Sequence, residues 1–380
     1  MLGKTNVTAL REGAIITDVE DYRWVRIPSG TYGDFVKAVY KNECLAAVTA
    51  DGKVVHTADG EAWEVSEPGF AGCRLNDIEW DGSRFILVGS CTDENTSGRT
   101  GLILATTDFT SYEKKELSGI SGVDEYLAVL ARNGSYILVT SKPGVVYTDL
   151  EQGTQGGSLK YNGEYNTVNV SAVKNTGRIL VYLYERGGGH PVVSHVHSLC
   201  MVDGDSCRRL KTYDSGAAQD KAAVSLLECK DALYAMGLLS GLNYNLEKIT
   251  DANEIMVMST GQNYMFVDGV YFNGCQIFIN SHEMLVVKKG ESLADKTAAD
   301  LKEIAPELTL RCVTKAFGQL FLFGSQGLIL RSSVETDNEG AIAVQTLSAK
   351  KALAEAKAYA DGKYTELETR IAELERKLLS

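Results

Sequence analysis

The chain has 380 residues, and 38 Lys plus Arg against 50 Asp plus Glu give it a net charge of −12. This acidity argues against a nucleic-acid or anionic-membrane binder, because phosphate contacts need clusters of Lys and Arg. No apolar run reaches the roughly 18 to 20 residues that span a bilayer, so we expect no insertion into a membrane.

The first predicted strand follows an N-terminal extension, residues 1–20. Residues 22–27 (Tyr-Arg-Trp-Val-Arg-Ile) resemble residues 61–65 (Glu-Ala-Trp-Glu-Val), which fall at the fourth-strand position of a repeat unit. We therefore expect residues 22–27 to supply the fourth strand of the last unit, which would remove the open edge of the sheet. Residues 341–347 are the alternative for this strand.

Residues 21–335 form a predicted β-propeller, because short apolar runs meet at tight turns about every 40 to 55 residues, a period typical of propeller blades. Seven units start near residues 36, 73, 125, 164, 220, 264 and 308. Turn signals such as Asn133-Gly134 and Asn273-Gly274 supply the positive φ angles of a hairpin. The predicted fold class is all-β: a seven-bladed β-propeller closed by an N-terminal strand and followed by a C-terminal α-helical coiled coil.

A second motif recurs later in the units. It reads Thr-Ala-Asp-Gly-Glu-Ala-Trp at residues 57–63 and Thr-Thr-Asp-Phe-Thr-Ser-Tyr at residues 106–112. The first copy resembles the Asp-box of bacterial neuraminidase repeats, with Gly placed directly after Asp. In that family the Asp caps the turn between the third and fourth strands and the aromatic residue packs into the blade. The resemblance implies structural turn roles for Asp59, Trp63, Asp108 and Tyr112.

The eight cysteines contain no Cys-x-x-Cys pair. Most lie within apolar runs, as is typical of buried free thiols in a protein from a reducing compartment. His195 and His197 would point to the same side of a strand, and His190 precedes them, so a metal site is one interpretation. We favour ordinary polar residues on an outer strand face and predict no metal, no cofactor and no catalytic residue.

The two longest insertions, residues 91–100 and 185–194, both join the second and third strands of their units. Loops of this kind share one edge of a propeller, and binding residues gather on loops held by a rigid scaffold. Ordinary solvated loop is the alternative interpretation. The candidate ligand-binding residues are Asp93, Glu94, Asn95, Arg99, Arg186 and His190.

After a linker, residues 336–347, the composition of residues 348–380 shifts to Ala, Glu, Lys and Leu. Apolar residues alternate three and four apart, which predicts a coiled coil joining copies of the chain. The opposite charges at the g and e positions favour a parallel arrangement, and Ile at a with Leu at d favours a dimer. A helix that packs back on its own propeller is the alternative, because isolated helices of this size are marginal. The predicted oligomer seam consists of Tyr364, Leu367, Ile371, Leu374 and Leu378.

An N-terminal segment, a propeller head and a C-terminal coil together resemble phage tail fibre or receptor-binding proteins. The resemblance implies a trimeric, non-catalytic adhesin of the virion or phage tail that recognises a bacterial surface glycan or protein. The N-terminus lacks the apolar stretch of a signal peptide, which fits synthesis in the bacterial cytoplasm. Two alternatives stay open. One is a sialidase-like glycoside hydrolase, because residues 25–28 (Val-Arg-Ile-Pro) resemble a sialidase motif containing Arg26. The other is an intracellular propeller scaffold for protein–protein interaction.

Overall fold

The structure is a computed structural model. Residues Trp24–Ser332 form one compact unit, which contains the sheets of the fold. Between residues 154 and 262 only some side chains are described. None of the helical segments in the described part of the chain is long and apolar enough to cross a bilayer. The described residues are 22–93, 96, 98–117, 120, 122–132, 134–141, 144–150, 154–158, 165–175, 179–187, 195–203, 206–214, 225–229, 232–238, 244–249, 255–262, 266–288, 296–302, 304 and 309–333.

Four-stranded sheets make up this unit, and six of them each use four consecutive strands, the pattern of propeller blades. The first three of these are β2 (Phe35–Lys41), β3 (Cys44–Thr49), β4 (Val54–Thr57) and β5 (Glu64–Ser66); β6 (Arg74–Trp80), β7 (Phe85–Thr92), β8 (Arg99–Thr106) and β9 (Glu113–Lys114); and β10 (Tyr126–Arg132), β11 (Ser135–Thr140), β12 (Gly144–Thr148) and β13 (Thr154–Ser158). The next three are β14 (Tyr165–Asn175), β15 (Ile179–Gly187), β16 (His195–Asp203) and β17 (Ser206–Asp214); β18 (Ser225–Cys229), β19 (Ala232–Leu238), β20 (Tyr244–Ile249) and β21 (Ile255–Gln262); and β22 (Asp268–Phe272), β23 (Cys275–Ile279), β24 (Glu283–Val287) and β25 (Thr297–Asp300). A seventh sheet is composite, with the order β1-β28-β27-β26; its strands are β1 (Arg23–Ile27), β26 (Leu310–Ala316), β27 (Gln319–Gly324) and β28 (Ile329–Ser333).

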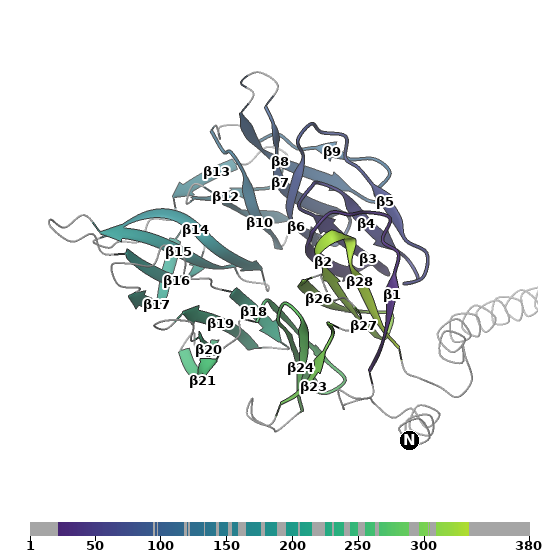
Figure 1. Cartoon of the computed structure of the whole chain (residues 1–380). Coiled ribbons are helices and arrows are strands. Elements are labelled where there is room, and N and C mark those ends of the chain that lie inside the picture. The colour runs from purple at the N-terminus through teal and green to yellow at the C-terminus, as the bar shows by residue number, and fades with distance from the viewer. Residues whose placement is uncertain are drawn as a thin grey trace, which may run out of the picture. The chain divides into compact units, whose positions relative to one another are not determined.

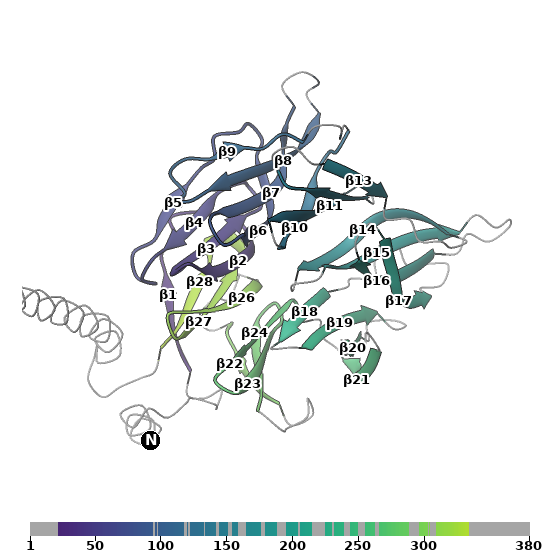
Figure 2. The same cartoon turned by 180° about the vertical axis from the view of Figure 1, so that it is seen from behind.

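The first strands of the sheets follow one another around a common centre (Figures 1 and 2). In chain order β2 contacts β6, β6 contacts β10, β10 contacts β14, β14 contacts β18, β18 contacts β22 and β22 contacts β26. Strand β26 then contacts β2, so the series returns to its start. This closed series is the β-propeller arrangement, with the first strand of each sheet innermost.

Positive φ angles form the turn between the first and second strands of several blades. Asn42 and Glu43 both have positive φ, 50° and 58°, and so do Asn273 and Gly274, 49° and 80°. Two successive residues of positive φ give the turn whose twist matches that of paired antiparallel strands. These turns therefore place the first and second strands of their sheets side by side.

The apolar core lies between neighbouring sheets. Ile78 and Leu87 of one blade pack with Ala46 and Val48 of the preceding blade. On the other face of the same blade, Ile86 packs with residues of the following blade. Both faces of the sheet are thus covered, which explains why its second strand is a continuous apolar run rather than an alternating one.

The composite sheet closes the ring, because β1 is the neighbour of β28. Ile27 of β1 belongs to an apolar cluster with Phe323 of β27 and Phe35 of β2. The expectation that residues 22–27 supply the outer strand of the last sheet agrees with this order. Residues 341–347, the alternative for that strand, lie outside the described residues.

The two edges of the ring carry different connections because strands within a blade are antiparallel. Turns from the first to the second strand, and from the third to the fourth, lie on what we call the turn edge. Connections from the second to the third strand, and between sheets, lie on the opposite loop edge. Since β28 is the third strand of its sheet and β1 the fourth, β28 ends and β1 begins at the turn edge.

The fold class inferred from the sequence requires a correction. We predicted a seven-bladed propeller followed by a C-terminal α-helical coiled coil, whereas the fold of the described residues is an all-β propeller. Six blades consist of consecutive strands, and the remaining sheet is composite. The helical element of the described part is a single 3₁₀ turn, η3 (Ser325–Gly327). The heptad spacing indicates only that residues 348–380 could form an amphipathic helix. It does not show that a coiled coil forms, because a helix of this length depends on packing for its stability.

Several predicted segments lie outside the described residues. They are the extension at residues 1–20, the linker at residues 336–347, and residues 348–380 with the seam Tyr364, Leu367, Ile371, Leu374 and Leu378.

Candidate functional site

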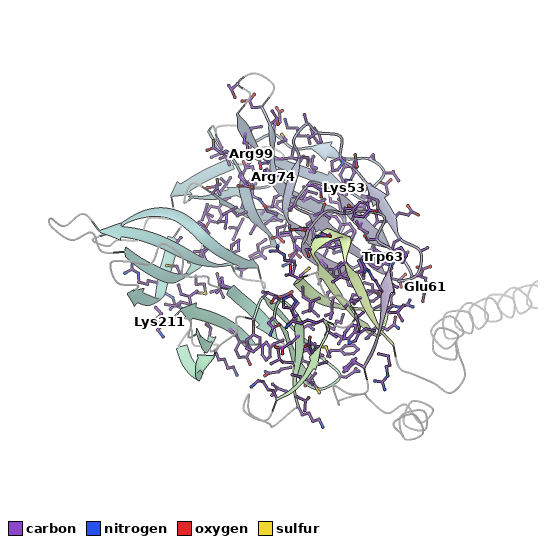
Figure 3. All side chains as sticks on the ribbon, in the orientation of Figure 1. Lys53, Glu61, Trp63, Arg74, Arg99 and Lys211 are labelled. Atoms are coloured by element: carbon purple, nitrogen blue, oxygen red, sulfur yellow. The ribbon has the colours of Figure 1, made fainter. Side chains whose placement is uncertain are left out.

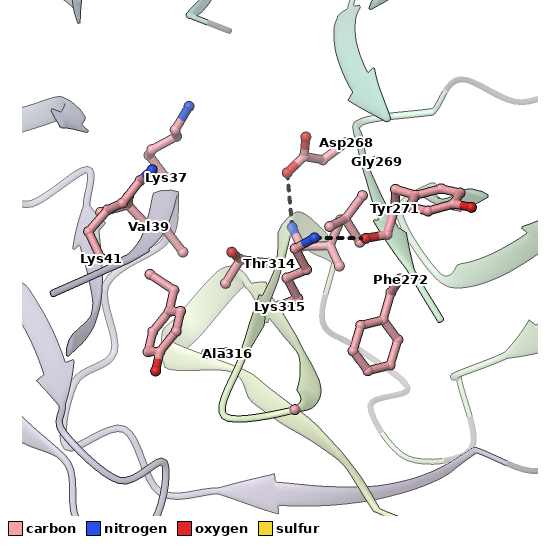
Figure 4. A pocket seen from close by; sticks show the side chains of 15 residues that line it. Lys37, Val39, Lys41, Asp268, Gly269, Tyr271, Phe272, Thr314, Lys315 and Ala316 are labelled. Atoms are coloured by element: carbon pink, nitrogen blue, oxygen red, sulfur yellow. Dashed lines mark hydrogen bonds between the residues drawn. The ribbon is translucent and has the colours of Figure 1, made fainter. Parts of the chain in front are cut away.

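A pocket of about 710 Å³ lies at the centre of the ring, where the first strands β2, β22 and β26 come together. Figure 4 shows residues of β2 on one side of the pocket, residues of β22 on the other, and β26 between them. The turn residue Gly318 also lines the pocket, which therefore reaches towards the turn edge. Ligand sites are concave and few in any one protein, so this pocket is the candidate functional site.

Three lysines and one aspartate give the pocket a positive lining. Lys37 and Lys41 come from β2, Lys315 from β26 and Asp268 from β22. The chain as a whole carries a net charge of −12, so the pocket is a local reversal of the overall charge. Lys41 and Lys315 are both exposed, which leaves their ammonium groups accessible to a ligand.

Hydrogen bonds between β22 and β26 fix one wall of the pocket. Asp268 is only 6% exposed, and its carboxylate accepts a hydrogen bond of 2.9 Å from the backbone N–H of Val313. The Lys315 ammonium donates to the carbonyl oxygen of Tyr271 at 3.3 Å. Figure 4 shows both bonds as dashed lines. Side chains thus tie two inner strands that belong to different sheets.

Asp77 makes a similar connection between β6 and β10. It is 4% exposed, and its carboxylate accepts hydrogen bonds from the N–H groups of Ile78 at 2.9 Å and Val129 at 3.1 Å. The Lys37 ammonium lies 3.8 Å from the same carboxylate. Burial, followed by the negative charge of Asp77, raises the pKa of nearby Glu79, and the charge of Lys37 partly opposes this. Lys37 is therefore shared between the pocket and an internal acidic pair.

Aromatic side chains line the pocket towards the turn edge. Tyr40 and Phe272 both contribute to the lining. The Tyr40 ring packs edge-on against Phe317, with ring centroids 4.8 Å apart. Burial, and then the negative charge of Glu43, raises the pKa of Tyr40 above that of a free phenol. The hydroxyl is therefore neutral at neutral pH and can donate a hydrogen bond.

The groups in this pocket suit recognition of an anion. Ammonium groups and a phenol donate hydrogen bonds, and such bonds are stronger when the acceptor is a carboxylate or a phosphate. Among the described residues, no group of three or more His, Cys, Asp and Glu side chains is placed to hold a metal ion.

Two of the predicted ligand-binding residues are described at the loop edge, and neither lines the pocket. The Asp93 carboxylate accepts a hydrogen bond of 2.8 Å from the hydroxyl of Thr96. The guanidinium of Arg99, labelled in Figure 3, donates to the hydroxyl of Ser90 at 3.1 Å and to the carbonyl of Gly72 at 3.3 Å. Asp93 and Arg99 thus bond to residues of their own blade, and Arg99 also bonds to the connection that precedes β6.

The other predicted residues stay untested. Arg186 belongs to β15, and His195 and His197 belong to β16, but the side chains of all three are outside the description. The grouping of Arg186 with the first loop and the interpretation of His195 and His197 as polar residues of an outer strand face therefore stay predictions. The predicted residues that lie wholly outside the described segments are Glu94, Asn95 and His190.

Asp59 lies in the turn between β4 and β5, and its carboxylate organises that turn. It accepts hydrogen bonds from the N–H groups of Glu61 at 2.8 Å and Ala62 at 2.9 Å. Trp63, labelled in Figure 3, follows this turn. Its ring centroid lies 6.0 Å from that of Phe321 in the composite sheet. The turn thus connects the first blade to the sheet that closes the ring.

Asp108 has the same arrangement in the turn between β8 and β9. Its carboxylate accepts a hydrogen bond of 2.9 Å from the N–H of Thr110. The next residue, Phe109, has φ 59°, and the first copy of the turn has a glycine with positive φ, Gly60 at 79°, in the same place. The Tyr112 hydroxyl lies 2.5 Å from that of Ser66, so this turn also contacts the preceding blade.

Arg26, the residue behind the sialidase alternative, lies far from the pocket within its sheet. It is exposed on β1, the outermost strand, whereas β26, the innermost strand of the same sheet, lines the pocket. An arginine at this place cannot hold a sugar carboxylate at the centre of the ring. The sialidase interpretation therefore gains no support from the fold.

The pocket residues were not among those singled out in the sequence. One signal was present, because Lys37 and Lys41 are four residues apart in a predicted strand and so share a face. Their proximity to Lys315 and Asp268 was not visible, since it arises only when the two ends of the propeller meet.

No protein-family model and no curated protein matches this sequence. Solved β-propellers do match the fold. The structure titled "YCF48 bound to D1 peptide" has a TM-score of 0.58 and 13% identity, and the match covers 86% of this chain and 99% of that one. A streptogramin B lyase has a TM-score of 0.57 and 10% identity, covering 83% and 99%. The WD40 β-propeller domain of Doa1 has a TM-score of 0.53 and 15% identity, covering 84% and 98%. At these identities the likeness establishes a β-propeller fold alone.

Proposed function

We propose that this propeller is a protein-interaction module that binds a segment of a partner protein in its central pocket. The observation that carries the proposal is the pocket between β2, β22 and β26, with a volume of about 710 Å³. Its lining combines ammonium groups with aromatic rings, a combination that binds a peptide through both charge and apolar contact. We propose a binding role and not an enzymatic one.

The structural comparisons support a protein partner. One of the similar propellers was solved with a D1 peptide, and another is a WD40 propeller domain. The likeness concerns the fold. It supports a protein as the class of partner, but it does not indicate which protein or which sequence is bound.

The test is a screen of the full chain against an array of random-sequence peptides. Thr314, half-buried in the pocket lining, is replaced by tryptophan to fill the pocket. Thr297→Trp is the matched control, because Thr297 is exposed on the outermost strand of a neighbouring blade. We expect Thr314→Trp to lose the peptides that wild type and Thr297→Trp retain. Equal binding by all three proteins would contradict the proposal, and circular dichroism checks that each variant is folded.

A receptor-binding head of a phage tail is a second candidate. One observation favours it: β1 begins and β28 ends at the turn edge, opposite the β7–β8 loop. A head carried by these ends of its chain would present that loop outward. The measurement is retention of labelled protein on intact bacterial cells. Unchanged retention after replacing residues 94–97 by Gly and Ser would contradict this candidate.

A further inference from the structure

We propose that the pocket selects an acidic segment of its partner, and that Lys41 and Lys315 bind the carboxylates of that segment. The inference rests on the proposed protein-binding function and adds the chemistry of the partner. It follows from which groups of the pocket are already engaged and which are accessible.

The wall between β22 and β26 does not favour binding by strand addition. An added strand needs consecutive backbone N–H and C=O groups along an open sheet edge. Here the N–H of Val313 already donates to Asp268, and the carbonyl of Tyr271 already accepts from Lys315. Side chains rather than backbone groups therefore have to recognise the partner at this wall.

The three lysines differ in what they already contact. The Lys37 ammonium lies 3.8 Å from the buried carboxylate of Asp77, so Lys37 already has an anionic partner within the fold. Lys41 is exposed, and its charge acts on the Glu79 carboxylate less than the charge of Lys37 does. Lys315 is exposed and donates to a neutral carbonyl. A carboxylate is a stronger acceptor for an ammonium group than a neutral carbonyl is. Lys41 and Lys315 are thus the two cations that gain most from an acidic ligand.

The shape of the lining favours a chain over a small ion. Lys41 and Lys315 stand on different strands, β2 and β26 (Figure 4). The rings of Tyr40 and Phe272 line the same pocket. A peptide can offer carboxylates to both ammonium groups and apolar contact to the rings at once. The acidic surface of the chain does not prevent this, since exposed charges are screened beyond about 8 Å at physiological ionic strength.

The experiment measures binding of three fluorescein-labelled octapeptides to the full chain by fluorescence anisotropy at physiological ionic strength, where the acidic surface of the chain is screened. Serine alternates with Glu in the first, Gln in the second and Lys in the third. We expect the Glu peptide to bind about tenfold more tightly than the Lys peptide, because two accessible ion pairs separate them. The double variant Lys41→Glu/Lys315→Glu should reverse this order.

A matched control keeps the change in net charge the same. Lys114→Glu/Lys302→Glu alters two lysines that are exposed away from the pocket. It should leave the preference for the Glu peptide unchanged. The neutral double variant Lys41→Gln/Lys315→Gln should remove the preference for the Glu peptide without reversing it. This variant tests the inference if the charge-reversed protein fails to fold.

The outcomes separate this inference from the proposed function. If the peptides found in the array screen bind through the pocket but the preference for Glu is absent, or survives in both Lys41/Lys315 variants, the charge inference is wrong and the binding function stands. If the array screen yields no peptide that depends on the pocket, the proposed function is wrong and this inference falls with it.

Discussion

Asp77 and Asp268 make the same connection in two parts of the ring, yet only one of them borders the pocket. Each carboxylate accepts a hydrogen bond from an N–H of the next inner strand. The residue after Asp77 is Ile78, which is buried in the apolar core between two blades. The residue after Asp268 is Gly269, which lines the pocket. One kind of connection therefore supports either a packed junction or a cavity, according to the side chain beside it.

The comparison shows how a repeating fold acquires a site. The carboxylate keeps neighbouring inner strands together in both junctions, so the ring does not depend on packing by every residue next to it. Where a large apolar side chain is absent, space remains and charged residues can line it. The following predictions test whether the two aspartates are equivalent in this way.

The largest effect is expected for Asp77→Ala. The change removes the buried carboxylate that accepts from the N–H groups of Ile78 and Val129 and lies beside Lys37, so the free energy of unfolding should fall by about 3 kcal/mol. Urea denaturation measures it. Asp77→Asn, which keeps an acceptor oxygen, should lose less. A loss below about 1 kcal/mol in the alanine variant would show that the connection is dispensable.

Asp268→Ala should lower the free energy of unfolding by less, about 1 to 2 kcal/mol. The carboxylate accepts from the N–H of Val313, and the pocket beside it can admit water in its place. The same urea experiment compares the two variants. A loss equal to or greater than that of Asp77→Ala would contradict the difference that we draw between the junctions.

Lys37→Gln is expected to lower the free energy of unfolding by a smaller amount, about 0.5 to 1 kcal/mol. The Lys37 side chain is 25% exposed and lies 3.8 Å from the carboxylate of Asp77, a separation at which ion pairs contribute modestly. Combining Lys37→Gln with Asp77→Ala in a double-mutant cycle isolates the pair. Strict additivity of the two losses would mean that Lys37 and Asp77 are not energetically coupled.

The smallest effect is a change in pH dependence at Glu79. Burial raises its pKa above the ordinary value of 4.5, so the folded state holds the proton more tightly than the unfolded state does. The stability contributed by the protonated form is present below the unfolded pKa and is lost as pH rises through the folded pKa. Glu79→Gln should therefore gain stability relative to wild type between acidic and neutral pH.

Denaturation of both proteins at the two pH values measures this gain. A difference between them that does not change with pH would count against a raised pKa at Glu79. Glu113→Gln is the control, since Glu113 is exposed on β9 and hydrogen bonding to Lys115 lowers its pKa, which predicts a trend of opposite sign.

The hairpins and the ring closure could be predicted because their signals are local. The Asn273-Gly274 pair specifies a turn by itself, and residues 22–27 share a sequence pattern with residues 61–65. Phe109 shows the limit of such signals. It takes positive φ without being glycine or asparagine, at a place where its buried ring packs against Phe85, with ring centroids 4.8 Å apart. Tertiary packing decided that turn.

The pocket could not be predicted because its residues are distant in the sequence. Lys41 and Lys315 come from opposite ends of the propeller, and their strands, β2 and β26, lie side by side only because the ring closes on itself. Arg99 shows the converse difficulty, since it was prominent in a long loop of the sequence but donates hydrogen bonds to Ser90 and to the carbonyl of Gly72. Whether a charged side chain is exposed or hydrogen-bonded depends on its neighbours in the fold, and the sequence does not show which residues these are.

The pairing of β1 with β28 also has a mechanical consequence. Because β1 begins and β28 ends at the same edge, tension applied at those two points would pull their hydrogen bonds apart one after another, in the manner of a zipper, instead of loading all of them together. Under strain the propeller would therefore open at this seam first.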